Sequence, residues 1–217
     1  MKKLKPLKPL YLFLFYIILG LAQVLVRILY PVRTLGRENL IKDRGFVLAG
    51  NHLFAIDPLF VLLARGFSKK MLIMGKQELF GLNPVLDFFW NVAGVFPVRR
   101  GTADRSAIEA AVEDVKGGRG LLIFPEGTRS KDGKLGALKT GAFAVAMMAE
   151  ADIIPCVIWY KGGRPRPFHR ITVVFGKPLT QQQLGIEGDY STKKMRAAKE
   201  AYAEALQQMQ IDYEGKM

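Results

Sequence analysis

The chain has 217 residues, of which half are hydrophobic. This length suits one domain with a full core and little room for a second, and the apolar content excludes a disordered or nucleic-acid-tail composition. The 32 Lys and Arg outnumber the 19 Asp and Glu by 13, so we expect an acidic partner: nucleic acid, an anionic membrane surface or a phosphorylated substrate.

The amino terminus distinguishes between these partners. Four lysines within residues 2–8 precede an apolar run of seventeen residues, 10–26, which only Gly20 and Gln23 interrupt. That length is at the short limit of what crosses a bilayer. No small-residue cleavage site follows, which argues against a signal peptide, and aromatic side chains on all faces argue against a buried core helix. We expect residues 1–30 to be a membrane anchor, either one tilted span or a helical hairpin bent near Gly20 that enters one leaflet.

The charges that flank the run bear on its topology. Positive-inside bias would keep the lysine end in the cytoplasm, and a true span would then place the rest of the chain outside. Arg27, Arg33 and Arg37 follow the run and oppose export. They favour the one-leaflet alternative.

Beyond Pro31, which is expected to end the anchor, residues 33–44 are predicted to be a polar connector. Short apolar runs then alternate with helical patterns. Strands are predicted at residues 46–49, 71–74, 94–98, 120–124, 153–159 and 171–175. Helices are predicted at residues 58–64, 85–92, 103–116, 142–150 and 192–210. This alternation indicates an α/β fold, a mostly parallel sheet flanked by helices, in a domain of residues 31–217.

The last predicted helix carries apolar residues at helical spacing. They are Met195, Ala198, Tyr202, Leu206 and Met209. Such a stripe is typical of a helix that faces the core.

The chain has only two histidines, His52 and His169, and His is the side chain that most readily exchanges a proton near neutral pH. Asp57 lies five positions after His52, which on a regular helix is a turn of about 500° and places the two on different faces. They can meet only if residues 52–56 form a turn, and the sequence supports one, because Asp57 as N-cap and Pro58 as the first helical residue make a good helix start. His52 would then be a general base that Asp57 orients. The alternative is a capping Asp beside an ordinary His.

A second candidate segment follows the predicted strand at 120–124 and contains Glu126, Gly127, Thr128 and Arg129. Glycine lets a backbone approach a ligand closely, and the planar Arg fork suits phosphate oxygens. Glu126 would orient Arg129 or a substrate hydroxyl. The alternative is a solvated turn with a surface ion pair.

Two further segments carry less chemistry. Arg99 and Arg100 end a predicted strand and suit a phosphate, or they form a positive surface patch. Cys156, the single cysteine, lies in an apolar run and is predicted to be a core residue rather than a nucleophile. One cysteine excludes an intramolecular disulfide and a cysteine-rich metal site, and it fits a reducing compartment.

Together these segments resemble the glycerolipid acyltransferase family, and within it the bacterial lysophosphatidic acid acyltransferases, over about residues 30–180. The family's blocks match residues 51–57 (Asn-His-four residues-Asp), 76–79 with 94–100, 124–130 (Phe-Pro-Glu-Gly-Thr-Arg-Ser) and 153–158 (an apolar strand with one proline). Phe54 stands where many relatives have a small hydroxyl residue, and Arg99 where an Asp often precedes the arginine. These departures leave the identity of the acceptor open.

The resemblance implies acyl transfer from a thioester, acyl-CoA or acyl carrier protein, to the sn-2 hydroxyl of 1-acylglycerol-3-phosphate, giving phosphatidic acid. His52 would deprotonate the acceptor hydroxyl and Asp57 would orient the imidazole, without a covalent acyl-enzyme. The residues expected by resemblance to bind the substrate are Arg100, Glu126, Gly127, Thr128, Arg129 and Lys139. No metal and no cofactor besides the thioester are expected.

The resemblance also gives the anchor a purpose at the cytoplasmic face of the inner membrane. There the domain would meet lysophosphatidic acid in the leaflet and acyl-CoA or acyl carrier protein from the cytosol. Two alternatives are an acyltransferase for another lysolipid and a non-catalytic, membrane-anchored protein that binds anionic lipid. A nucleic-acid partner fits the net charge but not the anchor, and the sequence has no recognised nucleic-acid-binding motif.

Overall fold

The computed structural model describes residues 17, 20–21, 24–66, 71–92, 94–98, 105–130, 132–213 and 215–216. The strands in these residues are β1 Val32–Leu35, β2 Phe46–Gly50, β3 Met71–Lys76, β4 Val95–Val98, β5 Gly120–Ile123, β6 Ile153–Tyr160 and β7 Ile171–Phe175. They form one sheet in the order β1-β7-β6-β2-β5-β3-β4. Five of its six strand pairings are parallel, and only β6 and β7 run antiparallel. The predicted α/β fold with a mostly parallel sheet is confirmed.

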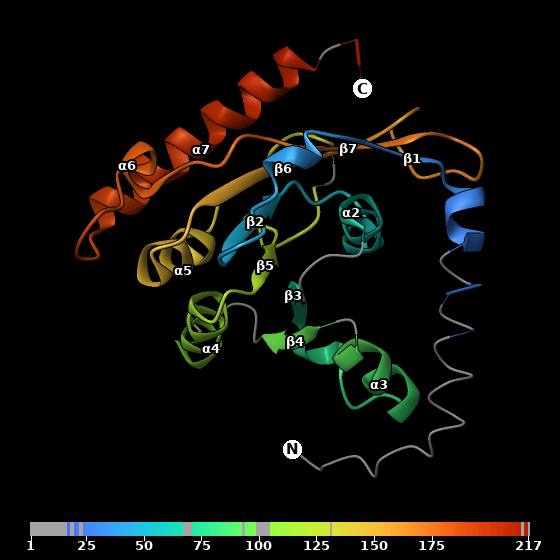
Figure 1. Cartoon of the computed structure of the whole chain (residues 1–217), viewed down its shortest axis with the longest axis horizontal. Coiled ribbons are helices and arrows are strands. Elements are labelled where there is room, and N and C mark those ends of the chain that lie inside the picture. The colour runs from blue at the N-terminus through green and yellow to red at the C-terminus, as the bar shows by residue number, and fades with distance from the viewer. Residues whose placement is uncertain are drawn as a thin grey trace.

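Helices cover both faces of the sheet (Figure 1). They are α2 Asp57–Arg65, α3 Pro84–Val92, α4 Arg105–Lys116, α5 Gly141–Ala149, α6 Gln181–Leu184 and α7 Thr192–Asp212, with the 3-10 helices η1 Arg37–Asn39 and η2 Gln77–Leu79. Helix α2 lies on one face, and α4, α5 and α7 lie on the other. Each of the eleven predicted elements is present with bounds within two residues of the prediction, although residues 103 and 104 lie outside the described residues.

Alternate residues of the central strands divide between two cores. On one face Leu48 and Leu122 pack with Phe60 of α2, and on the other Val47 and Leu121 belong to a core that includes α5 and α7. Strands buried on both faces appear in the sequence as nearly continuous apolar runs, which is why these strands were predictable. The stripe of α7 is buried at all five predicted positions.

Residues 24–29 form an amino-terminal helical segment that packs against α2. Arg27 Nη2 donates to the Leu63 carbonyl at 3.0 Å, and the rings of Tyr30 and Phe60 lie 5.5 Å apart. Within the described part of the chain, none of the helices has both the length and the apolarity needed to cross a membrane. Much of the expected anchor, residues 1–16, 18–19 and 22–23, lies outside the described residues, so the anchor stays a prediction.

The prediction of a polar connector over residues 33–44 is wrong, because β1 and η1 occupy much of it. β1 is an edge strand of four residues that pairs with β7, and its charged residue Arg33 is exposed. A four-residue strand that contains an arginine shows too little hydrophobic periodicity to be predicted from the sequence. Helix α6 was also missed, although Thr180 and Gln183 form the capping box that marks its start.

The crossovers create a switch point at the carboxyl edge of the sheet. The chain leaves β2 through α2 on one face to reach β3, and it leaves β5 through α5 on the other face to reach β6. β2 and β5 are neighbours in the sheet. In open α/β sheets ligands bind outside the carboxyl ends of two such strands.

Gly36 joins β1 to η1 at a point where a side chain would not fit. Its φ is 68°, and a Cβ there would lie 2.0 Å from the Phe175 carbonyl oxygen. We expect Gly36→Ala to lower the free energy of unfolding by about 1–3 kcal/mol more than Gly81→Ala. Gly81 is the matched control because its φ is also positive, 82°, but nothing lies within 4 Å of its Cβ position. Equal urea midpoints for the two variants would contradict this packing.

Candidate active site

Asn51 ends β2 by pairing its side chain with the neighbouring strand. Its Nδ2 donates to the Ile158 carbonyl at 3.1 Å, and its Oδ1 accepts from the Ile158 amide at 2.7 Å. The side chain therefore extends the contact between β2 and β6 by one residue beyond the backbone ladder. His52 is the first residue beyond this clamp and starts the loop that leads to α2.

His52 and Asp57 meet across a tight turn. The Nδ1 atom of His52 lies 2.9 Å from Oδ2 of Asp57, and the Asp57 amide donates to the Phe54 carbonyl to close the turn. Asp57 is fully buried and His52 is 8% exposed. The predicted turn and the predicted contact between the two side chains are confirmed.

The Asp57 carboxylate accepts hydrogen bonds from three further donors. Oδ2 accepts from the amides of Leu53 and Phe54 at 2.6 and 2.8 Å, and Oδ1 accepts from the Tyr160 hydroxyl. The predicted N-cap role of Asp57 is wrong. The N-cap is Ile56, with no side-chain cap, because the carboxylate turns back toward the loop where the four donors converge.

Burial sets the protonation of two groups near this carboxylate. It raises the pKa of Tyr160, and the charge of Asp57 and the hydrogen bond to it add to the effect, so Tyr160 stays a neutral donor. Burial also raises the pKa of the Cys156 thiol, with a further contribution from Asp57. Cys156 is fully buried, which confirms its predicted core position. A thiol in this state is a poor nucleophile.

The His52 ring is held in one orientation. It stacks on Phe124, with centroids 4.2 Å apart and an angle of 19° between the planes. With the Asp57 carboxylate as acceptor, we assign the ring proton to Nδ1 and the lone pair to Nε2. Nε2 has no hydrogen-bond partner among the described residues, so this atom is available to take a proton.

Glu126 links the segment after β5 to the loop after β2. It is 4% exposed; its Oε1 accepts from the His52 amide at 3.0 Å and its Oε2 from the Gly136 amide at 2.9 Å. The Ser130 amide donates in turn to the His52 carbonyl at 2.7 Å. Both amide and carbonyl of His52 are therefore bonded to residues 126–130, and a role of Glu126 toward the substrate stays a prediction.

The remaining predicted residues lie at or beyond this junction. Gly127 has a φ of 68°, and a Cβ on it would lie 3.3 Å from Cγ of Lys139, so the Lys139 stem runs alongside it. The side chains of Thr128 and Arg129 are exposed and form no hydrogen bond with another described residue. Arg100 lies outside the described residues. The structure thus brings together His52, Asp57, Glu126, Gly127 and Lys139.

A hollow of about 600 Å³ is lined by Asn51 and Leu53, the residues before and after His52 in the chain. Its walls come from the loop after β2, the end of β6 and the last turns of α7, and its lining combines apolar side chains such as Leu53, Val157 and Trp159 with the amides of Asn51, Gln207 and Gln210. Its volume falls in the range of small-molecule sites. Among the described residues, no cluster of three or more His, Cys, Asp or Glu is placed to hold a metal ion.

Sequence reasoning missed the contributions of Tyr160 and Phe124 and the clamp formed by Asn51. Tyr160 lies 103 positions from Asp57, so no local pattern connects them. One available signal was that β6, like β2 and β5, ends at the carboxyl edge, where a terminal aromatic hydroxyl can reach a neighbouring loop.

Glu126→Gln tests the link between the two loops. A carboxamide has one acceptor oxygen, so one of the two amides, of His52 or Gly136, must face an NH2 group and lose its partner. We expect the free energy of unfolding to fall by about 1–3 kcal/mol, measured by urea denaturation. The control Glu200→Gln changes an exposed pair with Arg196 and should have little effect. A Glu126→Gln variant as stable as this control would show that the link contributes nothing.

The chain resembles acyltransferases of known sequence. The family model described as Acyltransferase matches residues 31–159. A chloroplastic 1-acyl-sn-glycerol-3-phosphate acyltransferase of Arabidopsis thaliana, LPAT1, is 34% identical over 61% of this chain and 37% of its own length. The 1-acyl-sn-glycerol-3-phosphate acyltransferase of Bacillus subtilis is 29% identical over 86% of this chain and 89% of its own length.

The chain is also similar to a solved structure, and it covers only part of the length of some relatives. The crystal structure of the 1-acyl-sn-glycerophosphate acyltransferase PlsC of Thermotoga maritima has a TM-score of 0.59 at 22% identity, covering 82% of this chain and 71% of that one, and it supports the fold. The chain spans less than half the length of the plant relative and of a Borreliella burgdorferi relative. The family match itself covers more than half of the chain and includes the His52–Asp57 turn and residues 124–130. The chain therefore belongs to the Acyltransferase family.

Proposed function

We propose that the protein transfers an acyl chain from a thioester, acyl-CoA or acyl carrier protein, to the sn-2 hydroxyl of 1-acylglycerol-3-phosphate. The observation that carries the proposal is the buried His52–Asp57 pair with a free Nε2, at the carboxyl edge of an Acyltransferase-family sheet. The curated relatives bear the name of this activity. The product is phosphatidic acid.

In the proposed reaction His52 Nε2 takes the proton of the acceptor hydroxyl as the oxygen attacks the thioester carbonyl. Asp57, hydrogen-bonded at Nδ1, stabilises the imidazolium that forms. The tetrahedral intermediate then collapses, the C–S bond breaks, and the thiolate leaves as a thiol with the proton that His52 holds. No acyl-enzyme forms, in keeping with the buried, protonated thiol of Cys156.

The exposed cations beside the site are proposed to bind the phosphate of the acceptor. Arg129 offers a planar pair of donors, and Lys139 lies along Gly127 at the same turn. Arg100 and Thr128 are proposed to contribute on the basis of the family motif. Glu126 is proposed to act mainly by holding His52 and the 132–136 segment in place, since both its oxygens accept backbone amides.

The hollow next to the loop after β2 is proposed to receive part of the acyl chain, because Leu53 of that loop lines it together with the apolar side chains of Val157, Ile158, Trp159 and Ile211. We also propose that residues 1–30 anchor the domain of residues 31–217 to the cytoplasmic face of the inner membrane. A lipid acceptor would then enter from the leaflet and the thioester from the cytosol.

One observation favours a second candidate acceptor. Phe54 packs edge-on against Tyr160, with ring centroids 5.1 Å apart, at a position where the family resemblance leads us to expect a small hydroxyl residue. A bulky ring beside the Asp57 loop changes the space near the acceptor. Another lysolipid is therefore the alternative substrate, and a panel of lysolipids assayed with one thioester donor distinguishes the two.

The charge of Asp57 can be removed while its side chain keeps a hydrogen bond to each of its four partners, with the direction reversed only at Tyr160. In Asp57→Asn the amide oxygen can accept from His52 and the two loop amides while Nδ2 donates to the Tyr160 oxygen, so stability should change by no more than about 1 kcal/mol. Loss of the charge should lower turnover about 10⁴-fold, as the same change does in a serine-protease triad.

The assay follows release of free thiol with lysophosphatidic acid as acceptor. His52→Ala should abolish turnover in a folded protein. Cys156→Ala, the control for a buried side chain next to the same loop, should retain it. Full activity of His52→Ala would remove the general-base mechanism, and an inactive but folded Cys156→Ala would revive a thiol nucleophile.

Arg129→Lys tests the proposed phosphate contact. Lysine keeps the charge but offers a single point donor in place of a fork, so KM for lysophosphatidic acid should rise about tenfold. The thioester KM should stay the same. The control Arg119→Lys changes an exposed arginine that pairs with Asp114 at the start of β5. Equal acceptor KM values for the two variants would refute the contact.

A further inference from the structure

The hairpin that joins β6 to β7, residues 161–170, has an unusual composition and backbone. Its sequence, Lys-Gly-Gly-Arg-Pro-Arg-Pro-Phe-His-Arg, holds four Lys and Arg and no acid. Phe168 is 71% exposed and has a φ of 63°, in the left-handed region that non-glycine residues rarely occupy. Strained backbone persists where the surrounding structure holds it, and it clusters at functional sites.

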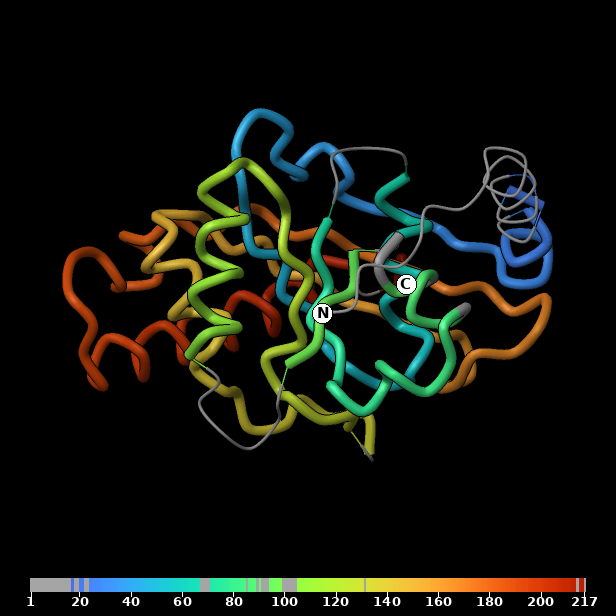
Figure 2. Tube along the Cα trace, turned by 90° about the horizontal axis from the view of Figure 1, so that it is seen from below, coloured from blue at the N-terminus to red at the C-terminus, as the bar shows by residue number. Residues whose placement is uncertain are grey.

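The hairpin is joined to the amino-terminal helical segment. The Phe168 amide donates to the Leu29 carbonyl, and the Ile171 amide donates to the Pro31 carbonyl at 3.0 Å. The two elements lie side by side at one end of the molecule, away from α6 and the start of α7 (Figures 1 and 2). Any surface that the helical segment touches is therefore within reach of Phe168.

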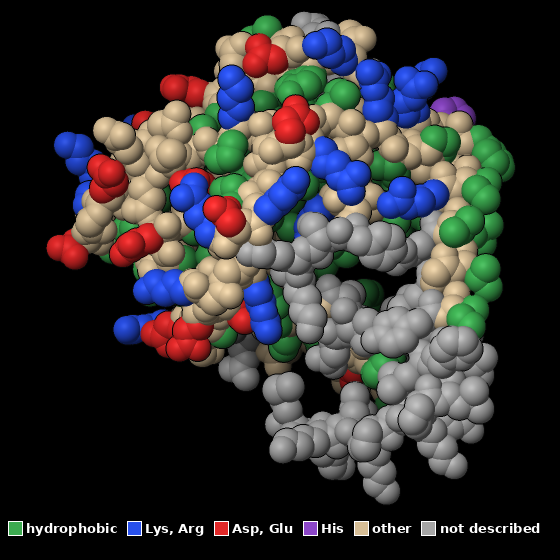
Figure 3. Space-filling view, viewed as in Figure 1, with side chains coloured by type: hydrophobic (Ala, Val, Ile, Leu, Met, Phe, Trp, Pro, Cys, Tyr) green, Lys and Arg blue, Asp and Glu red, His purple; other side chains and the backbone are tan. Residues whose placement is uncertain are grey.

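The outer face of the helical residues is apolar. Its exposed members follow helical spacing and are Ile17, Leu21, Val24, Leu25 and Ile28. Figure 3 shows hydrophobic side chains in a column along this edge, with Lys and Arg gathered near its upper end. An exposed apolar ridge beside cations is typical of an element that lies in a membrane interface.

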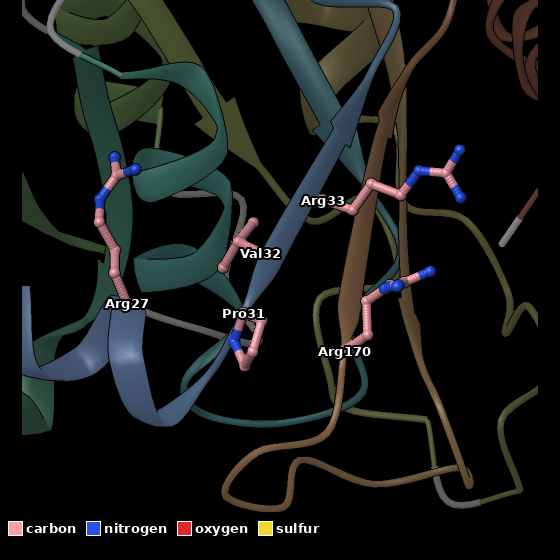
Figure 4. A pocket seen from close by; sticks show the side chains of 5 residues that line it. All are labelled: Arg27, Pro31, Val32, Arg33 and Arg170. Atoms are coloured by element: carbon pink, nitrogen blue, oxygen red, sulfur yellow. The ribbon is translucent and has the colours of Figure 1, made fainter.

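Positive charge is concentrated at this end of the chain. Residues 24–33 and 161–170 hold six Lys and Arg and no Asp or Glu, against a net charge of +13 for the whole chain. Within the described part of the chain none of these six forms a salt bridge. Arg27, Arg33 and Arg170 line a hollow of about 620 Å³ at the edge strand β1, where Arg33 and Arg170 extend side by side (Figure 4).

We propose that the β6–β7 hairpin is a second membrane contact, in which Phe168 enters the interface of an anionic bilayer and the hairpin arginines bind lipid phosphates. An anionic bilayer can contact the apolar ridge and the cations together, because its acyl chains bury apolar side chains and its headgroups carry negative charge. An acidic protein would satisfy only the cations. The inference extends the proposed function, and its tests require no turnover.

The hairpin is connected to the proposed active site through Tyr160. The hairpin begins at residue 161, immediately after Tyr160, whose hydroxyl donates to Asp57. Two contacts, the amino-terminal segment and the hairpin, fix the rotation of the domain on the membrane, whereas one helix would leave it free to turn. Docking of the hairpin would therefore hold the carboxyl edge of the sheet toward the leaflet.

The first test places a fluorescent reporter at the tip. Full-length Phe168→Trp is bound to phosphatidylglycerol-containing vesicles with brominated acyl chains, and its emission is compared with the wild-type protein, which has two tryptophans. We expect a blue shift and quenching of the added emission. The control is Tyr190→Trp, which is 57% exposed in the loop before α7 and should show neither. Equal quenching at the two positions would overturn the proposal.

Charge variants in the Phe168→Trp background test the phosphate contacts. Arg164→Gln with Arg166→Gln should reduce the quenching, because each cation near an anionic surface favours binding about fivefold. The control pair Lys116→Gln with Lys177→Gln removes two exposed cations at the opposite edge of the sheet and should leave it unchanged. The same loss in both pairs would show that only net charge matters and would refute a hairpin site.

Amide exchange of the unmodified protein gives an independent measurement. Amides of residues 161–170 should exchange more slowly on phosphatidylglycerol vesicles than in detergent. Protection by an acidic carrier protein in detergent, without protection by vesicles, would make the hairpin a protein site and refute the membrane contact. Loss of acyltransferase activity with hairpin protection intact would instead count against the proposed reaction alone.

Discussion

The structure depends on the way a buried carboxylate is satisfied. Asp57 has no exposed surface, and an unpaired charge there would be very costly. Four donors converge on it: the imidazole of His52, the amides of Leu53 and Phe54, and the hydroxyl of Tyr160. Because these bonds offset the desolvation of the charge, the loop after β2 has little freedom to adopt another conformation. The same bonds give His52 its tautomer and leave Nε2 available, so the stability of the loop and the proposed chemistry have a common cause.

The sheet explains why these groups can meet. β6, β2 and β5 are adjacent and parallel, so their carboxyl ends lie at one edge. β2 leads to His52, β5 to Glu126, and β6 ends at Tyr160. Glu126 fixes the His52 backbone from the β5 side while Asp57 fixes its ring, and Phe124 supports the ring by stacking. A site held from three strands is preorganised, which is the condition under which proton transfer and oxyanion stabilisation are efficient.

The proposed membrane contacts relate this geometry to the location of a lipid substrate. The hairpin after β6 follows Tyr160 directly and is hydrogen-bonded to the end of the amino-terminal helical segment. The edge that carries the site is thus also the edge with the exposed apolar ridge and with arginines that, among the described residues, form no salt bridge. Such an arrangement would shorten the path of an acceptor from the leaflet to His52 and leave the opposite edge of the sheet facing the cytosol.

The sequence by itself determined the elements whose pattern is local. Central strands buried on both faces appear as apolar runs, the stripe of α7 repeats at helical spacing, and the spacing of His52 and Asp57 required a turn. It did not reveal β1, which is four residues long and lies at an edge, and it assigned Asp57 to a helix cap. Only the tertiary structure decided that the carboxylate faces the loop, that Tyr160 donates to it, and that Glu126 holds the His52 backbone. These contacts join residues 74 and 103 positions apart, and their partners are set by strand order, which no local periodicity encodes.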